Sequence, residues 1–277
     1  MQTTALEKDD EKRFCLPEER QHAILQKLAD DGRVVALELS RDFKISEDTI
    51  RRDLRELAAA GLCRRVYGGA LPVSPASRSL DERRTYHPLR KQKLGEKMCT
   101  LLCAGQVVFV DAGSTNLAVM QALGDDLALT VVTNSPAIGV AVANRSRIKL
   151  LMIGGQIDPR TGASFGARAL RDLSFVRPDV YLLGACAVDA EAGVSAFDGE
   201  EAEFKRTLAE QACCVLSAAT NDKLATRAPF LALPTKGLSD LVLEADAPPS
   251  VIASLREQGV RVHLAATQGP MLDGGRS

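Results

Sequence analysis

From about residue 90 onward, the chain alternates between short apolar runs and segments with helical periodicity. The apolar runs lie at residues 107–110, 129–132, 148–153, 180–183, 213–216 and 241–243. Helical segments are expected near residues 91–103, 115–123, 136–144, 199–211 and 248–258. Strands that are apolar throughout are buried on both faces, as in a largely parallel sheet covered by helices. This alternation predicts an α/β domain over residues 90–265.

Small and polar residues follow three successive strands of this sheet, and ligands of such sheets bind beyond the carboxyl ends of the strands. These residues are Asp111, Gly113, Ser114, Thr115 and Asn116 after the first strand, Thr133 and Asn134 after the second, and Gly154 and Gly155 after the third. Glycine lets the backbone approach an anion, hydroxyl groups donate to phosphate oxygens, and a helix N-terminus favours negative charge. One such turn often only caps a helix, but three together favour an anion-binding site.

Charged residues that suit the same site occur further along the chain. Asp198, Glu201 and Lys205 lie close together in the sequence, and Lys223 follows the strand 213–216. Because Glu201 and Lys205 are four residues apart, their side chains lie one above the other on a helix. An ordinary ion pair on the surface is an equally good interpretation of this spacing.

The N-terminal part predicts a different module, with three short helices and a hairpin over residues 17–71. Ser46 is a good N-cap for the third helix, in which Ile50, Leu54 and Leu57 share one side and face the other two helices. The opposite side is polar and rich in arginine, as in the recognition helix of a helix-turn-helix. The candidate DNA-binding residues are Ser46, Asp48, Thr49, Arg51, Arg52 and Arg55 in this helix, and Arg64, Arg65 and Tyr67 in the hairpin, which would form a wing.

The distribution of charge agrees with this interpretation. Residues 1–97 carry 20 Lys+Arg and 17 Asp+Glu, a net charge of +3, and residues 98–277 carry −4, which together give the −1 of the whole chain. A positive segment joined to a mildly acidic body suits a nucleic-acid binder with a small-ligand domain. Composition alone fits a solvated charged surface equally well.

Two groups of motifs make the chain resemble the DeoR family of bacterial transcriptional regulators. The first is Thr-Ile-Arg-Arg-Asp-Leu at residues 49–54 followed by Gly-Gly-Ala at 68–70, with Tyr67 where the family usually has His. The second is Asp-Ala-Gly-Ser-Thr at 111–115, Thr-Asn-Ser at 133–135, and the spaced residues Asp198, Glu201-Ala202 and Lys205-Arg206. The chain departs from the family pattern at Thr220, where an Asp is usual.

This resemblance implies a repressor of a carbohydrate-catabolic operon, which binds a double-stranded DNA operator and is released by a phosphorylated sugar. It implies a winged helix-turn-helix followed by an effector domain similar in fold to ribose-5-phosphate isomerase. It places the phosphate on Gly113, Ser114, Thr115 and Asn116, and the rest of the effector on Asp111, Thr133, Asn134, Asp198, Glu201, Lys205 and Lys223.

Between the two modules, residues 72–89 have prolines, serines and arginines but no apolar period, which predicts a linker. The seven cysteines and three histidines lack the spacing of zinc ligands, so we expect reduced thiols and neither a metal nor a cofactor. No apolar run approaches the roughly 20 residues of a spanning helix, which predicts a cytoplasmic protein without membrane contact. A winged helix reads only a short half-site, which favours a homo-oligomer. The alternatives are an enzyme, such as a sugar-phosphate isomerase or a related hydrolase, and a DNA-binding adaptor with an empty pocket.

Overall fold

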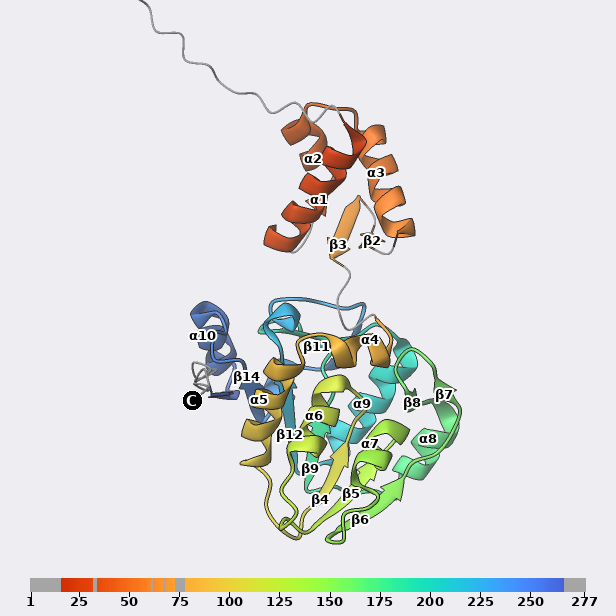
Figure 1. The fold of residues 1–277 in the computed structure, drawn as a ribbon, viewed down its shortest axis with the longest axis vertical. Coiled ribbons are helices and arrows are strands. Elements are labelled where there is room, and N and C mark those ends of the chain that lie inside the picture. Colours follow the sequence, from red (N-terminus) through yellow and green to blue (C-terminus); the bar gives the residue numbers. More distant parts are fainter. Residues whose placement is uncertain (1–15, 32–33, 61, 67, 73–77, 267–277) are drawn as a thin grey trace, which may run out of the picture. The chain divides into compact units, whose positions relative to one another are not determined.

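The computed structural model describes residues 16–31, 34–60, 62–66, 68–72 and 78–266. The chain forms two compact units, Met1–Val73 and Ser74–Ser277 (Figure 1). The first unit has the helices α1 (Pro17–Asp31), α2 (Ala36–Phe43) and α3 (Glu47–Ala59). Its antiparallel sheet has the order β1 (Val34–Val35), β3 (Gly69–Pro72) and β2 (Cys63–Val66).

The first unit is built around apolar residues that recur at helical spacing. Its core residues include Ile24, Leu28, Leu39, Phe43, Ile50, Leu54 and Leu57. The predicted arrangement of three helices and a hairpin is therefore confirmed, with the apolar side of α3 turned inward.

The second unit is organised by a parallel sheet of seven strands. In spatial order these are β15 (Arg261–Leu264), β14 (Asp240–Leu243), β12 (Cys214–Ala219), β9 (Val180–Leu183), β4 (Val107–Val110), β5 (Leu129–Thr133) and β6 (Ile148–Met152). The predicted mostly parallel sheet is thereby confirmed. β6 is an edge strand, so Leu151 and Met152 are exposed although the run is apolar.

Helices cover both faces of this sheet (Figure 1). One face packs against α5 (Pro88–Cys99), α6 (Ser114–Ala122) and α7 (Pro136–Val142), and the other against α8 (Gly166–Leu173), α9 (Gly199–Gln211) and α10 (Pro249–Glu257). Neighbouring residues of β4 point to opposite sides, with Val108 in one core and Phe109 in the other. This three-layer arrangement buries the central strands on both faces.

Smaller strands lie outside the main sheet. β10 (Ala187–Asp189), β11 (Gly193–Ala196) and β13 (Phe230–Leu233) form an antiparallel sheet, and β7 (Ile157–Asp158) pairs with β8 (Ala163–Ser164). β7 and β8 have only two residues each, too few for an apolar period, and the sequence did not indicate β10, β11 and β13 either.

The segment predicted to be a linker contains the helix α4 (Leu80–Thr85). Its N-terminus is a capping box, in which the Glu82 amide donates to the Ser79 hydroxyl and the Ser79 amide donates to the Glu82 carboxylate. Leu80 and Arg83 are buried. Apolar periodicity does not predict this helix, because one buried leucine makes no period; its signal in the sequence is the polar capping box.

Candidate functional site

The outer side of α3 is the candidate DNA-binding surface. Asp48, Arg51, Arg52 and Arg55 are exposed there, as the helical periodicity predicts. Ser46 begins the helix as its N-cap, because its hydroxyl accepts a hydrogen bond from the Thr49 amide at 3.2 Å.

Ion pairs along α3 hold two of these arginines in place. Arg51 pairs with Glu47 at 2.8 Å and Arg52 pairs with Glu56 at 3.1 Å, one helical turn apart in each case. Exposed pairs of this kind contribute only about 0.3–0.5 kcal/mol, so either guanidinium can exchange its carboxylate for a phosphate or a base edge at little cost. In the hairpin, Arg65 is exposed, whereas the side chain of Arg64 and the whole of Tyr67 lie outside the described residues.

A buried ion pair fixes α3 against α1. The Arg20 guanidinium donates to Asp53 from Nε and from Nη2, the latter at 2.9 Å, and the side chains are only 8% and 3% exposed. The hydrogen bonds that Arg20 donates to the Asp53 carboxylate, together with the charge of that carboxylate, outweigh burial and raise the pKa of Arg20. Asp53 thus serves the packing of the recognition helix, while its neighbours Arg51 and Arg52 face solvent.

In the second unit, a pocket lies where β4 and β9 end and α6 begins. Its lining is formed by Arg83, Ala112, Gly113, Thr115, Asn116, Arg160, Thr161, Phe165, Gly184, Ala185, Cys186, Glu201, Ala218 and Lys223. Five of the predicted effector residues are in this set, namely Gly113, Thr115, Asn116, Glu201 and Lys223. The pocket therefore occupies the edge of the sheet where ligands of parallel sheets bind.

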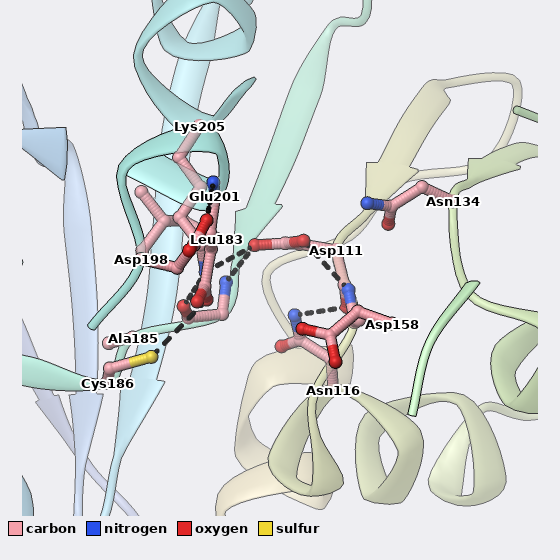
Figure 2. A network of polar contacts seen from close by, with 12 residues as sticks. Asp111, Asn116, Asn134, Asp158, Leu183, Ala185, Cys186, Asp198, Glu201 and Lys205 are labelled. Carbon is pink, nitrogen blue, oxygen red and sulfur yellow. Dashed lines mark hydrogen bonds and ion pairs between the residues drawn. The ribbon is translucent and has the colours of Figure 1, made fainter. Parts of the chain in front are cut away.

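Beside the pocket, three charged side chains form a buried network, in which Asp111, Glu201 and Lys205 point toward one another (Figure 2). The Lys205 amine lies 2.8 Å from Asp111 and 3.1 Å from Glu201. Burial alone would lower the pKa of Lys205, but the carboxylates of Asp111 and Glu201 outweigh it and the pKa is raised. The alternative of a surface ion pair is wrong, because Glu201 and Lys205 are almost fully buried.

Asp111 is the hub of this network. Its carboxylate also accepts hydrogen bonds from the Tyr181 hydroxyl at 3.2 Å and from the Gly184 amide at 3.1 Å. Every one of these partners is a donor from the chain itself. Asp111 and Lys205 therefore hold the ends of β4 and β9 and the helix α9 together, and they support the pocket from outside its lining.

The polar residues after the strands divide into two groups. Asn116 donates to the carbonyl oxygens of Asp111 and Leu182, and Thr133 donates to that of Val110. In contrast, the Thr115 hydroxyl and the Asn134 side-chain oxygen are buried and have no hydrogen-bond partner among the described residues. Asn116 and Thr133 therefore use their donors within the fold, whereas the unpartnered oxygens of Thr115 and Asn134 are left for a ligand or water.

The charge of the lining is predominantly positive. Arg83, Arg160 and Lys223 line it together with one carboxylate, Glu201, which pairs with Lys205 at 3.1 Å and with Arg160 at 3.6 Å. Arg160 also lies 3.6 Å from Asp158, whereas Arg83 and Lys223 are buried and have no ion pair among the described residues. Lys223 donates to the Ala185 carbonyl oxygen at 2.8 Å, and burial lowers its pKa. Burying the charges of Arg83 and Lys223 is unfavourable unless an anion balances them.

Other predicted residues lie outside the lining. Ser114 borders a separate groove with Arg84 and Lys91, and Asp198 caps α9 by accepting from the Glu201 amide at 3.0 Å. Gly154 and Gly155 follow β6 and are exposed. Asp111, Thr133, Asn134 and Lys205 are buried but do not border the pocket.

Sequence reasoning missed Arg83, Arg160, Thr161, Phe165 and Cys186, all of which line the pocket. Arg83 lies in the segment interpreted as a linker, and Arg160 and Thr161 lie between β7 and β8, which were not predicted. The one available signal was the capping-box pattern Ser79-x-x-Glu82, which would have placed Arg83 on a helix.

Within residues 16–266, apart from the gaps stated above, no group of three or more His, Cys, Asp or Glu is placed to hold a metal ion. Among the same residues, no helix combines the length and apolar character needed to cross a membrane.

Comparisons with known proteins agree with both modules. Residues 20–76 match the family model of the DeoR-like helix-turn-helix domain, and residues 87–245 match that of the DeoR C terminal sensor domain. The HTH-type transcriptional regulator GlpR of Haloferax volcanii is 34% identical over 215 residues, which cover 76% of this chain and 84% of that protein. The glycerol-3-phosphate regulon repressor of Escherichia coli (strain K12) is 29% identical over 249 residues, which cover 89% of this chain and 98% of the relative.

Solved structures give weaker likenesses. Ribose 5-phosphate isomerase A from Neisseria gonorrhoeae aligns with a TM-score of 0.38 and 18% identity, covering 55% of this chain and 56% of that one. The full-length sorbitol operon regulator SorC from Klebsiella pneumoniae aligns with a TM-score of 0.41 and 13% identity, covering 86% of this chain and 98% of that one.

Proposed function

Because this chain belongs to the DeoR family of transcriptional regulators, we propose that it is an operator-binding repressor whose pocket receives the phosphate group of a small phosphorylated sugar. In this proposal the arginine-rich side of α3 reads the operator and the wing residues contact the phosphate backbone. Binding of the effector to the second unit weakens operator binding. The regulated genes would encode enzymes of carbohydrate catabolism.

The charge of the pocket carries the proposal. Two buried cations that have no ion pair among the described residues, Arg83 and Lys223, line this space together with the unpartnered Thr115 hydroxyl. The one carboxylate of the lining, Glu201, is already paired with Lys205 and Arg160. A phosphate dianion supplies both the missing charge and the missing hydrogen-bond acceptors. An unphosphorylated sugar supplies neither, so it should bind far more weakly.

The same contacts argue against an enzyme. Isomerisation requires a carboxylate that is free to take a proton from the substrate. Asp111 and Glu201 both bind the Lys205 amine, and Asp111 also accepts hydrogen bonds from Tyr181 and Gly184. These carboxylates are held as structural anions, so we propose binding without turnover.

The relatives suggest where to begin the search for the effector. One of them is named as a repressor of the glycerol-3-phosphate regulon, which makes glycerol 3-phosphate the first compound to test. We further propose that the protein acts in the cytoplasm as a homo-oligomer, because the operator is chromosomal DNA and one winged helix reads only a short half-site.

A thermal-shift screen tests the proposal. The full chain is mixed with glycerol 3-phosphate, ribose 5-phosphate and fructose 1-phosphate, each beside its unphosphorylated parent. A ligand at about 100 times its Kd stabilises the folded state by about 2.7 kcal/mol. The phosphorylated member that stabilises the protein should release promoter DNA in a gel-shift titration, and chromatography should show it unchanged after incubation.

Two lysine variants make the screen specific for the pocket. Lys223→Met should weaken phosphate binding about tenfold or more, because it removes a buried charged donor from the lining. Lys236→Met is the matched control, since Lys236 is exposed and does not line the pocket. Equal stabilisation by sugars and their phosphates, or conversion of the ligand into product, would contradict the proposal.

A further inference from the structure

Arg83 brings a charge into the pocket from outside the sheet. It lies on α4, the first element of the second unit, and only 9% of the residue is exposed. Its side chain lines the pocket together with Thr115 and Lys223. Its neighbour on the same helix, Arg84, is exposed and pairs with Asp81 at 3.6 Å.

In the described part of the chain, no counter-ion pairs with the Arg83 guanidinium. Its Nε atom is buried without a hydrogen-bond partner, and among the described residues the side chain forms no ion pair. The carboxylates of Glu201 and Asp111 attract the charge of Arg83, but both are already paired with Lys205. Burial lowers the pKa of Arg83, which reflects the cost of removing this charge from water. Burying such a charge is costly unless an anion binds it.

Few contacts hold α4 in place. The helix has six residues, and Leu80 is its one buried apolar side chain within the described structure. The Leu80 amide donates to the Arg160 carbonyl oxygen at 3.0 Å, and its side chain occupies the space that a Cβ at Gly162 would fill. The Lys91 amine donates to the carbonyl oxygen of Arg83 within the helix at 2.5 Å and to that of Tyr86 just after it at 2.6 Å. Helices this short are marginal without tertiary contacts, so the balance of charge at Arg83 affects whether α4 docks.

We propose that Arg83 completes the phosphate site and that α4 is a strap whose docking on the second unit depends on the bound anion. This inference rests on the proposed function and adds its regulation. Without phosphate, docking buries an unbalanced guanidinium and is disfavoured. With phosphate, the same guanidinium donates to the ligand and α4 is held. Because the first unit ends at Val73, the strap lies directly after the DNA-binding unit in the chain and changes state with the pocket.

Hydrogen exchange of the full-length protein tests the strap. Inorganic phosphate serves as the probe because every phosphorylated sugar contains this group. In the wild-type protein, phosphate should slow exchange of the α4 amides about tenfold or more, while the amides of α3 stay unchanged. This measurement needs no substitution, so it does not depend on a variant that folds.

A pair of variants tests the role of the charge. Arg83→Met keeps the bulk of the side chain and removes the buried charge, so it should raise the thermal midpoint and slow α4 exchange without phosphate. It should also weaken phosphate binding about 10- to 100-fold, as expected for the loss of hydrogen bonds from a charged donor. Arg84→Met is the matched control and should behave like the wild type in both respects.

The outcomes separate the two proposals. Phosphate binding by Arg83→Met as tight as that of the wild type would overturn the assignment of Arg83. Fast exchange of α4 in wild type at saturating phosphate would overturn the strap even if Arg83 binds. If neither inorganic phosphate nor any phosphorylated sugar stabilises the wild type, the proposed function fails, whatever the result for α4 without ligand.

Discussion

Replacing Asp53 with alanine should unfold the DNA-binding unit and leave the second unit intact. The variant leaves the Arg20 guanidinium buried, with its side chain 8% exposed and without the carboxylate that now accepts two hydrogen bonds. Removing one partner of a buried ion pair costs about 3–5 kcal/mol. A domain of fewer than about 70 residues rarely has more than 3–5 kcal/mol of stability from its core, so this loss is comparable to the whole.

Hydrogen exchange on the full-length protein measures this effect unit by unit. In Asp53→Ala, the amides of α1 and α3 should exchange as in an unfolded segment, and those of β4 and β9 should keep their protection. Glu47→Ala is the control, because it breaks the exposed pair with Arg51, for which the loss is about 0.3–0.5 kcal/mol. The double variant Arg20→Met with Asp53→Leu should regain protection, since an apolar pair can replace a buried ion pair. Unchanged protection of α3 in Asp53→Ala would refute the reasoning.

Three further predictions concern the recognition surface and the pocket. Arg52→Ala should weaken operator binding by roughly 1–3 kcal/mol if its exposed guanidinium reads a guanine. Arg65→Ala should instead weaken binding to all DNA sequences alike and flatten the salt dependence, and gel shifts at two salt concentrations distinguish the two effects. Thr115→Asp should abolish stabilisation by phosphorylated sugars in calorimetric titration but keep operator binding, because a carboxylate repels phosphate yet is tolerated at the N-terminus of α6. Burial, and then the charge of Lys223, lower the pKa of Lys91 to about 8 from 10.5, so the unfolded chain binds more protons between these values. Stability should therefore rise with pH across that range, and chemical denaturation of Lys91→Met should show a smaller rise.

Local patterns were enough to predict much of the fold. Ile50, Leu54 and Leu57 recur at helical spacing, so the inner side of α3 and the exposed side with Arg51, Arg52 and Arg55 follow from the periodicity. The uninterrupted apolar runs likewise predicted the central strands of the parallel sheet, because only strands covered on both faces can be apolar throughout. The turns after β4 and β5 then had to meet at one edge of that sheet.

The sequence did not predict which side chains pair with one another. Spacing predicted that Glu201 and Lys205 lie one above the other, but it left open whether they lie on the surface or in the interior. The end of β4 decides this, because it brings Asp111 to the same amine. Asn116 and Thr133 are residue types that often bind ligands, but here their side chains donate hydrogen bonds to backbone carbonyl oxygens.

The sequence by itself determined the helices of the first unit, the central strands of the parallel sheet and which of their faces are apolar, because these properties depend on residues a few positions apart. The tertiary structure alone decided the electrostatics of the pocket. Arg83, Arg160 and Lys223 are separated by more than 60 residues from one to the next, and no local pattern relates them. Whether such a charge is solvated, paired or left without a counter-ion depends on its burial and on the side chains that distant segments bring near it. Those side chains also set the free energy of burying the charge.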